Sequence, residues 1–419
     1  MSALARIGDL VERRRDVVAA AQWVMAAIYF GLLLTPLLAP VGAGVGRFAE
    51  QAALWEEALF WGVWWPGVIL VTLVFGQVWC GLLCPDGTLS EWASRRGRAH
   101  KPSPWLRSAP WPILGFSLVA LASDLFDAHR SPLGALAAVG AVSAAAIVSG
   151  GYWGRGKRIW CRWLCPDAGV FSLLARAAIL HFRVDRAAWD AAPRPPPKAV
   201  DCPLLLDVRR LTGNEKCNMC ARCSGHRNAV VLAVRAPGAE IVTLRDDELR
   251  LSDAASIVFV LVGLTFVGLH WRQWPWRQGL VDVLGPSRLA EIGLGAVEIP
   301  LAAGVLGAAL ALGLWAAALG RRESALRLAY ALVPLAGLGL FAGLAEHALA
   351  LLAREGWATT DALIALRTLA VVVGAAWSLP LGRPALPATP GRRVLSFALW
   401  SALVVAVAAL YRFAPFPVL

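Results

Sequence analysis

Nine apolar runs, each long enough to cross a lipid bilayer, constrain the fold of this chain more than any other feature. A membrane-spanning helix needs about 20 mainly apolar residues. Such runs recur at 18–40, 58–79, 109–126, 132–152, 254–271, 294–319, 325–352, 360–381 and 394–413. Hydrophobic residues make up 58% of the 419 residues, and only 16% are charged. We therefore expect an all-α integral membrane protein with about nine transmembrane helices, the first of them an uncleaved anchor.

Arginine and lysine residues are concentrated in every second segment between these runs. They are dense before the first run and after the second, fourth, sixth and eighth, whereas the loops between are poorer in them. By the positive-inside rule the N-terminus is cytoplasmic and the C-terminus lies outside, although the loop 272–293 fits this pattern least well. The net charge of +12 is mostly this topology signal. It forms no concentrated basic patch, so we expect membrane lipid and no nucleic acid as a partner.

Four of the eight cysteines have the spacing of an iron–sulfur site. Cys217, Cys220 and Cys223 form CNMCARC, a C-x2-C-x2-C run that binds three irons of one [4Fe–4S] cluster, and the fourth ligand of such a cluster is often a remote cysteine before proline, as Cys202 is. A structural zinc site usually spaces its ligands as two separated pairs. We expect these four cysteines to hold a [4Fe–4S] cluster in a small ferredoxin-like segment between helices 4 and 5. Because that segment is short, the metal should supply much of its folding free energy.

The other four cysteines belong to an internal repeat. A shift of 81 residues aligns VWCGLLCPDG, which contains Cys80 and Cys84, with IWCRWLCPDA, which contains Cys161 and Cys165. Each copy ends a two-span hairpin, and such repeats commonly pack about a pseudo-twofold axis. We therefore expect the four thiols to converge as one site. A shared metal or iron–sulfur centre, thiol–disulfide or transient metal chemistry, and a structural role all remain open.

Residues around this repeat carry two further expectations. Asp86 and Asp167 follow Cys-Pro and are interpreted as helix N-caps rather than ligands. Arginines near the four cysteines should lower the pKa values of the thiols; they are Arg95, Arg158, Arg162 and Arg176.

The chain divides into three expected parts. Residues 1–182 contain the two hairpins that end in C-x3-C-P, residues 183–252 form the iron–sulfur segment, and residues 253–419 form a five-helix membrane domain. The charge pattern puts all eight cysteines on the cytoplasmic side. Reducing conditions there suit cluster assembly, and no disulfide is needed to explain any of these cysteines.

With these motifs, residues of about 1–235 resemble the NapH/NosR/CcoG group of membrane-bound polyferredoxin-type proteins. Members similar to NapH and NosR imply quinol-linked electron transfer to respiratory reductases, and CcoG-like members imply copper reduction for oxidase assembly. The resemblance also implies a multi-pass protein of the bacterial cytoplasmic (inner) membrane. Relatives usually carry two complete cluster runs, whereas here Arg227 stands where a further cysteine would follow Cys223. No large flavin domain precedes the first span, unlike in NosR.

Two functions follow from this interpretation. The first is electron transfer between the quinone pool or a cytoplasmic donor and a partner oxidoreductase or oxidase. The alternative is a copper reductase or metalloenzyme assembly factor whose C-x3-C-P thiolates, as soft ligands, suit Cu(I). Either protein would be an enzyme component, of the quinol dehydrogenase type or of a metal-reducing type. A transporter with a redox-gated C-terminal bundle is a third interpretation.

Ionisable residues inside membrane spans are functional candidates. In the C-terminal part these are His270, Glu298, Glu346, His347 and Arg367, with His129 in an earlier loop. Haem b ligation by His270 and His347, a quinol pocket, and anchoring at the lipid headgroups are the interpretations that remain open. His226, beside the cluster run, could ligate or tune the cluster.

Overall fold

The computed structural model describes residues 2–38, 55–108, 110–128, 131–192, 200–274, 277, 287–354, 356 and 359–415. The chain forms two compact units, each made from separate stretches of sequence. Unit 1 comprises Met1–Gly31, Val71–Phe116 and Val139–Glu240, and unit 2 comprises Leu32–Leu70, Ser117–Ala138 and Ile241–Leu419. All eight cysteines lie in unit 1.

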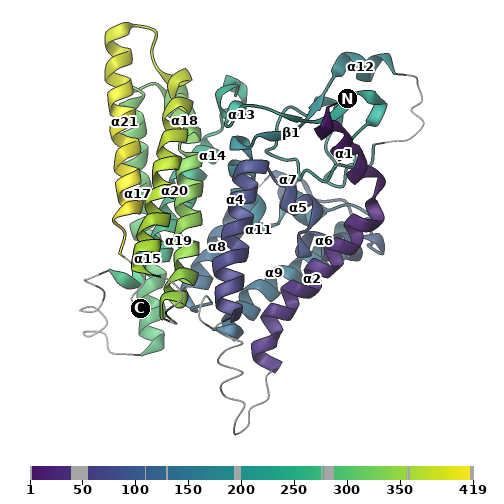
Figure 1. Ribbon diagram of the computed structural model, residues 1–419, viewed down its shortest axis with the longest axis horizontal. Helices are drawn as coiled ribbons and strands as arrows, with labels where there is room; N and C mark the ends of the chain where they lie inside the picture. Colours follow the sequence, from purple (N-terminus) through teal and green to yellow (C-terminus); the bar gives the residue numbers. More distant parts are fainter. Residues whose placement is uncertain are drawn as a thin grey trace. The chain divides into compact units, whose positions relative to one another are not determined.

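Helices account for most of the described chain (Figure 1). Up to the first strand they are α1 (Ala3–Arg13), α2 (Arg15–Leu38), η1 (Glu57–Trp64), α4 (Trp65–Phe75), α5 (Val78–Leu82), α6 (Pro85–Arg95), α7 (Pro104–Ser108), α8 (Trp111–Leu125), α9 (Pro132–Trp153), α10 (Ile159–Trp163), α11 (Pro166–Leu174) and η2 (Ala175–Ala177).

The strands β1 (Leu180–Val184) and β2 (Val230–Val234) enclose α12 (Arg186–Ala191), η3 (Val208–Arg210) and η4 (His226–Asn228). After β2 come α13 (Ala239–Val242), η5 (Asp246–Glu248), α14 (Leu251–Ala255), η6 (Ser256–Leu264), α15 (Thr265–His270), η7 (Trp271–Gln273), α17 (Arg288–Ala317), α18 (Arg322–Ala331), α19 (Val333–Arg354), α20 (Thr360–Leu381), η8 (Arg383–Ala385) and α21 (Pro390–Arg412).

Within the described residues, eight helical stretches are long and apolar enough to cross a membrane. They are Arg15–Leu34, Glu57–Phe75, Leu133–Trp153, Leu251–Gln273, Leu289–Ala317, Arg322–Ala350, Thr360–Ala385 and Pro390–Arg412. The protein is thus a largely helical, multi-pass membrane protein. The third of the nine expected spans, 109–126, is the shorter apolar helix α8, which has 15 residues. Which side of the membrane each loop faces remains a prediction.

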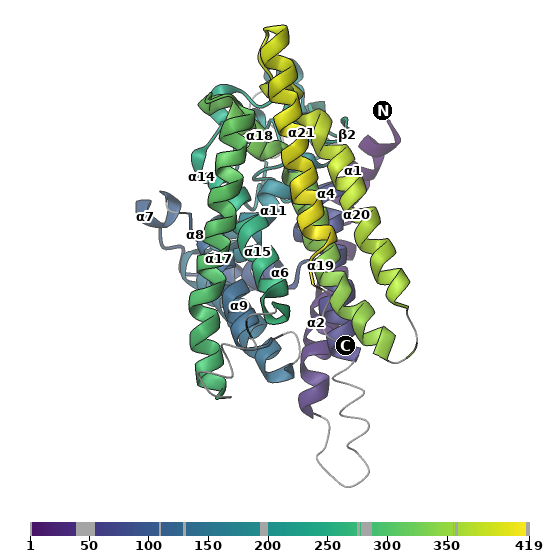
Figure 2. The same cartoon turned by 90° about the vertical axis from the view of Figure 1, so that its left-hand side faces the viewer.

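The helices of unit 2 pack as a bundle. Figures 1 and 2 show α19, α20 and α21 side by side, with α17 next to α21. Small residues allow close approach, and a Cβ built at Gly62 of η1 would overlap the Cβ of Ala348 in α19 at 1.8 Å. Such small-residue contacts are typical of helix packing in membranes, where there is little hydrophobic driving force between helices.

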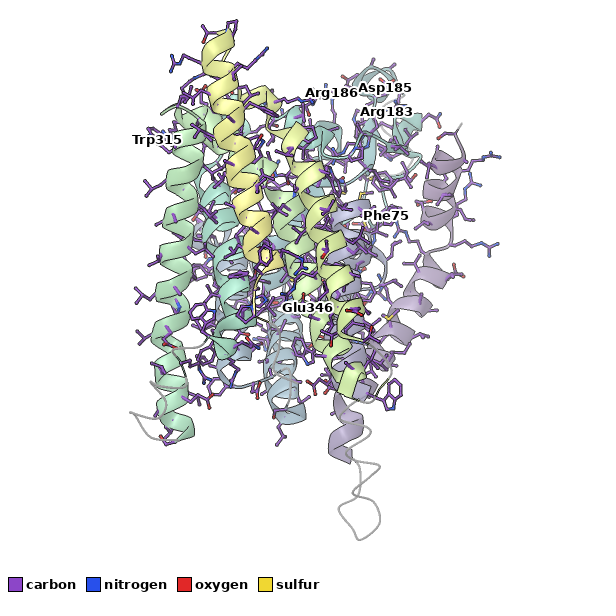
Figure 3. All side chains as sticks on the ribbon, turned by 60° about the vertical axis from the view of Figure 1, so that its left-hand side comes forward. Phe75, Arg183, Asp185, Arg186, Trp315 and Glu346 are labelled. Atoms are coloured by element: carbon purple, nitrogen blue, oxygen red, sulfur yellow. The ribbon has the colours of Figure 1, made fainter. Side chains whose placement is uncertain are left out.

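A buried ion pair lies inside this bundle. Glu346 on α19 and Arg367 on α20 are both 1% exposed, and Arg367 binds both carboxylate oxygens of Glu346. Arg367 Nη1 also donates to the carbonyl oxygen of Ala414, at 2.6 Å, and so joins the end of α21 to the pair. Figure 3 shows Glu346 among the helices and Trp315 pointing away from them. The anchoring interpretation is therefore wrong for Glu346 and Arg367, because the two side chains satisfy each other inside the protein.

A two-stranded antiparallel sheet organises the part of unit 1 that carries Cys202, Cys217, Cys220 and Cys223. Leu180 pairs with Val234 and Val184 with Val230, so β1 and β2 close a loop that contains the cysteine run. Phe182 and Val230 pack in a small apolar cluster whose other buried members are Val208, Cys217, Met219, Ala221 and Leu232. This sheet adds β structure to the predicted all-α chain. The three-part division of the sequence remains a prediction.

Candidate metal centres

The two C-x3-C-P sequences fold alike along the 81-residue repeat. α5 and α10 each have five residues. The C-cap of each is a leucine, Leu83 or Leu164, which comes just before the second cysteine of the pair. Cys84 has φ −58° and ψ 122°, and Cys165 has φ −56° and ψ 121°. Each caps the next helix, whose first residue is proline, a position that tolerates its missing N–H. The predicted repeat is therefore confirmed in the local backbone.

Asp86 and Asp167 are not the N-caps that the sequence suggested, because the cysteines occupy those positions. Asp86 lies at the second position of α6, is buried, and accepts a 2.5 Å hydrogen bond from the Ser143 hydroxyl. Burial raises the pKa of Asp86 to about 6 and that of Asp167 to about 7. Both carboxyls thus lie in the first turn of the helix that follows each cysteine pair, where the helix N-terminus favours negative charge.

Gly87 lies close to cysteines of both pairs. Its N–H donates to Cys84 Sγ at 3.4 Å. A Cβ built at Gly87 would lie 3.6 Å from Cys161 Sγ and 3.6 Å from the carbonyl oxygen of Cys80. Cys165 also interacts electrostatically with Cys84 and Cys80. The thiols from both copies therefore share one neighbourhood, and we refer to Cys80, Cys84, Cys161 and Cys165 as the paired set.

Burial raises the pKa of every thiol in the paired set, to about 11 for Cys161. Arg158 lowers the pKa values of Cys80 and Cys161, but the loss of water outweighs its charge. The prediction that arginines would lower these pKa values overall is therefore wrong. Arg176 faces elsewhere and pairs with Glu215 and Glu240. Buried thiols lose their protons when a metal supplies the compensating positive charge, so this set fits a metal centre.

The remaining cysteines line a common cavity. Cys202, Cys217, Cys220 and Cys223, which we refer to as the run set, all border one small cavity in unit 1. Met219 and Ala221, on either side of Cys220, have φ of 54° and 59°. Such left-handed conformations are unfavourable for residues other than glycine and often occur at ligand sites. They turn the backbone so that the cysteines face one space. Burial raises the pKa of Cys223 to about 12 and those of Cys217 and Cys202 above the ordinary value.

Three buried N–H donors beside the run set have no acceptor among the described residues: Arg15 Nη2, Arg162 Nη1 and Asn218 Nδ2. Arg15 donates from its other nitrogen, Nη1, to the carbonyl oxygen of Cys220 at 2.8 Å. Arg162 interacts electrostatically with Cys202. A buried donor without a partner costs about 1–3 kcal/mol, whereas the sulfurs of an iron–sulfur cluster accept such hydrogen bonds. The run set therefore fits a [4Fe–4S] cluster.

Glu91 joins the three cysteine-bearing segments, a role that no sequence motif predicts. Its carboxylate accepts a 2.7 Å hydrogen bond from Arg158 Nε and pairs with Arg222 of the cysteine run. Arg158 also donates to the carbonyl oxygen of Cys80 at 3.0 Å, and its backbone N–H donates to that of Pro203 at 2.8 Å. A single glutamate on a polar helix has no distinguishing spacing, so only the tertiary structure shows this role.

All eight cysteines are free thiols. Among the residues that the structure describes, no three Cys, His, Asp or Glu side chains converge tightly enough to hold a single metal ion. A cluster makes a different demand, because each thiolate binds a different iron of the cube.

Of the other residues singled out in the sequence, His226 lies beside the run set, because its backbone N–H donates to the carbonyl oxygen of Cys223 at 3.2 Å. His226 packs against Trp189, with ring centroids 4.9 Å apart. His270 is buried in unit 2, and its Nδ1 lies 2.7 Å from the carbonyl oxygen of Phe266. Glu298 is half-buried on α17. His129 and the side chain of His347 are outside the described residues, so the suggested His270–His347 haem site remains a prediction.

The family model of a 4Fe-4S binding domain matches residues 57–104 and 133–185. Each matched range contains one C-x3-C-P pair and adjoining membrane helix, whereas the run set lies outside both. No curated protein and no solved structure shows a significant match.

The match and the fold support one class of protein: an iron–sulfur protein with multiple membrane-spanning helices. More particularly, the match supports a ferredoxin-type family whose domain binds a 4Fe-4S cluster. Repetition of the match along the chain agrees with the 81-residue repeat.

Proposed function

We propose that this protein transfers electrons within the bacterial cytoplasmic membrane, between the quinone pool or a cytoplasmic donor and a partner oxidoreductase. The observation that carries the proposal is the presence of two sets of four free thiols, none of them exposed, within one unit. The matched 4Fe-4S binding domain covers the paired set, and the cysteine spacing supports the run set.

Each set would hold one [4Fe–4S] cluster. Cys80, Cys84, Cys161 and Cys165 would be the ligands of one, and Cys202, Cys217, Cys220 and Cys223 those of the other. When bound, such clusters accept and release one electron at a time. The protein contributes burial, which excludes water, and the N–H donors Arg15, Arg162 and Asn218, which would stabilise charge on the run set.

A recess near both sets is large enough to bind a small electron carrier such as a quinone. It has a volume of about 880 Å³ and is lined by Arg15 and Gln22 of α2, by Gly81, and by Glu91 and Arg222. This volume lies in the range of about 300–1,000 Å³ that small-molecule sites occupy. Arg15 bonds to Cys220 and Gln22 bonds to Gly81, so a bound quinone headgroup would lie beside residues that contact both sets. The recess is where we place the quinone.

Anaerobic purification of the full chain tests the proposal. We expect about eight iron atoms per chain, four for each cluster, with matching sulfide and EPR signals after reduction by dithionite. Cys84→Ser and Cys220→Ser should each remove the signal of one cluster and leave the other.

Metal analysis of the same samples separates the alternatives. Copper at the paired set without iron there would favour the copper reductase or assembly factor. Zinc in place of iron at the run set, or EPR signals that neither substitution changes, would contradict the proposal.

A further inference from the structure

Gly81, the residue after Cys80, touches the backbone of the cysteine run. A Cβ built at Gly81 would lie 2.0 Å from the carbonyl oxygen of Asn218 and 2.7 Å from the backbone nitrogen of Cys220. No side chain fits at such distances, so glycine is required for the two backbones to approach this closely. The loop of the first C-x3-C-P pair and the loop that carries Cys220 are therefore in main-chain contact.

Helix α2 fixes both sides of this contact. Arg15 Nη1 donates to the carbonyl oxygen of Cys220 at 2.8 Å, and Gln22 Nε2 donates to that of Gly81 at 3.3 Å. Arg15 and Gln22 are seven residues apart, which is about two helical turns, so they project from the same face of α2. One rigid helix thus sets the position of each loop relative to the other.

Arg158 holds the contact from another direction. It is 1% exposed, it donates to the carbonyl oxygen of Cys80, and its guanidinium interacts electrostatically with both Cys161 and Cys220. A buried cation therefore lies close to members of both sets. In a low-dielectric interior its charge would stabilise an added electron on either one.

We propose that the main-chain contact between Gly81 and Cys220 is the route by which one electron passes between the paired set and the run set. The inference rests on the proposed function, in which each set holds a cluster. With a cluster bound to each set, one cluster would lose the electron and be oxidised, and the other would gain it and be reduced; no covalent bond would form or break and no proton would move. Electronic coupling is stronger through bonded and touching atoms than across a gap, and Gly81 follows Cys80 directly while Cys220 is itself a ligand.

Magnetic coupling between the two reduced clusters tests the route without an activity assay. In the wild type we expect the EPR spectrum of the fully reduced protein to be broadened or split by spin–spin interaction. Gly81→Ala should force the loops apart and leave two independent spectra, while iron content is retained. Electron exchange between the clusters, followed by rapid-freeze EPR, should slow in parallel.

Gly97→Ala is the matched control. A Cβ at Gly97 would lie 2.1 Å from the carbonyl oxygen of Gly154, so the clash is as severe but lies at another contact of unit 1. This variant should keep the interaction. If Gly81→Ala does not fold, Gln22→Met removes only the donor to Gly81 and should weaken the interaction.

The outcomes separate the two proposals. An unchanged interaction in folded Gly81→Ala, or in Gln22→Met where that variant replaces it, would overturn the route. Two uncoupled clusters in the wild type would also overturn it and leave the proposed function standing. A wild type without iron would instead contradict the proposed function itself.

Discussion

Among single residues, Arg15 begins the first candidate membrane span and also contacts the run set. Its Nη1 binds the Cys220 carbonyl, while its Nη2 is buried without an acceptor in the described part of the chain. Hydrogen bonds and charge around the sulfurs set the reduction potential of an iron–sulfur cluster. We therefore expect Arg15 to influence the reduction potential of a cluster bound to the run set.

Arg15→Gln should lower the reduction potential of the run-set cluster. The reduced cluster carries one more negative charge than the oxidised cluster, so losing a positive charge and an N–H donor destabilises the reduced form more. An EPR-monitored redox titration measures the shift. Arg14→Gln removes the same charge from an exposed neighbour, and equal shifts in both variants would show that net charge alone is responsible.

Glu91→Gln should destabilise unit 1 and release iron more readily. The change leaves Arg158 buried and charged with no partner carboxylate, and breaking a buried ion pair in this way costs about 3–5 kcal/mol. Unfolding in detergent, followed by loss of cluster absorbance, measures the effect. Asp190→Asn removes a carboxylate from an exposed pair with Arg209 and should cost about 1 kcal/mol or less. If the two variants lose the same free energy of unfolding, the ion pairs of Glu91 contribute no more to stability than an exposed pair does.

At the scale of secondary-structure elements, the strands β1 and β2 pair at the two ends of the loop that contains the run set. They are separated by 45 residues of sequence, yet Phe182 pairs with Leu232 in register. Residues of both strands pack with Cys217 and Met219 in one apolar cluster. The sheet therefore supplies a fixed base for the run set, whose loop has little regular structure of its own.

Much of this arrangement could be predicted from local sequence, and the rest depends on tertiary contacts. The cysteine spacing identified both sets, and the 81-residue repeat predicted the matching helices around Cys84 and Cys165. The strands were missed because LHFRV and VVLAV are short and pair over a long separation. The pKa values of the cysteines were predicted with the wrong sign, since the nearby arginines are visible in the sequence but burial is not. The contacts of Gly81 with Asn218 and Cys220, and those of Glu91 with Arg158 and Arg222, join residues that are distant in sequence.

His181 should make the stability of this segment depend on pH. It lies in β1, where burial, with Arg235 and Arg183 nearby, lowers its pKa from 6.5 to about 4. Between these values the unfolded chain binds more protons than the folded chain, so the free energy of unfolding falls as pH decreases from 6.5 to about 4. Above 6.5 the contribution of His181 is complete.

His181→Gln should flatten this dependence. Unfolding of the full chain would be compared at about pH 7 and about pH 5, on either side of the ordinary histidine pKa. His100→Gln, in an exposed loop, controls for the general effect of acid on the protein. If the wild type and His181→Gln lose the same stability over this range, another group is responsible.

At the scale of the whole molecule, α8 decides how many times the chain crosses the membrane. Its 15 residues span about 22 Å, against a hydrocarbon core of about 30 Å. Length alone would leave it on one side, but short helices can cross where the bilayer thins or flanking residues extend the span. If it crosses, the arginines at 321–322 and at 383–393 fall on the same side as those at 95–98, as the positive-inside rule requires. We therefore expect α8 to cross.

Single cysteines at exposed positions test this topology. Arg98→Cys, Ser287→Cys and Ala388→Cys would be labelled with a membrane-impermeant maleimide in intact cells and in inverted vesicles, with the native protein as baseline. Position 287 should react from outside, and positions 98 and 388 only in inverted vesicles, because nine crossings place the arginine-rich loops in the cytoplasm. If α8 does not cross, positions 287 and 388 exchange sides while position 98 is unchanged. Reaction of position 98 from outside would instead reverse the whole orientation and move the cysteine sets to the other face.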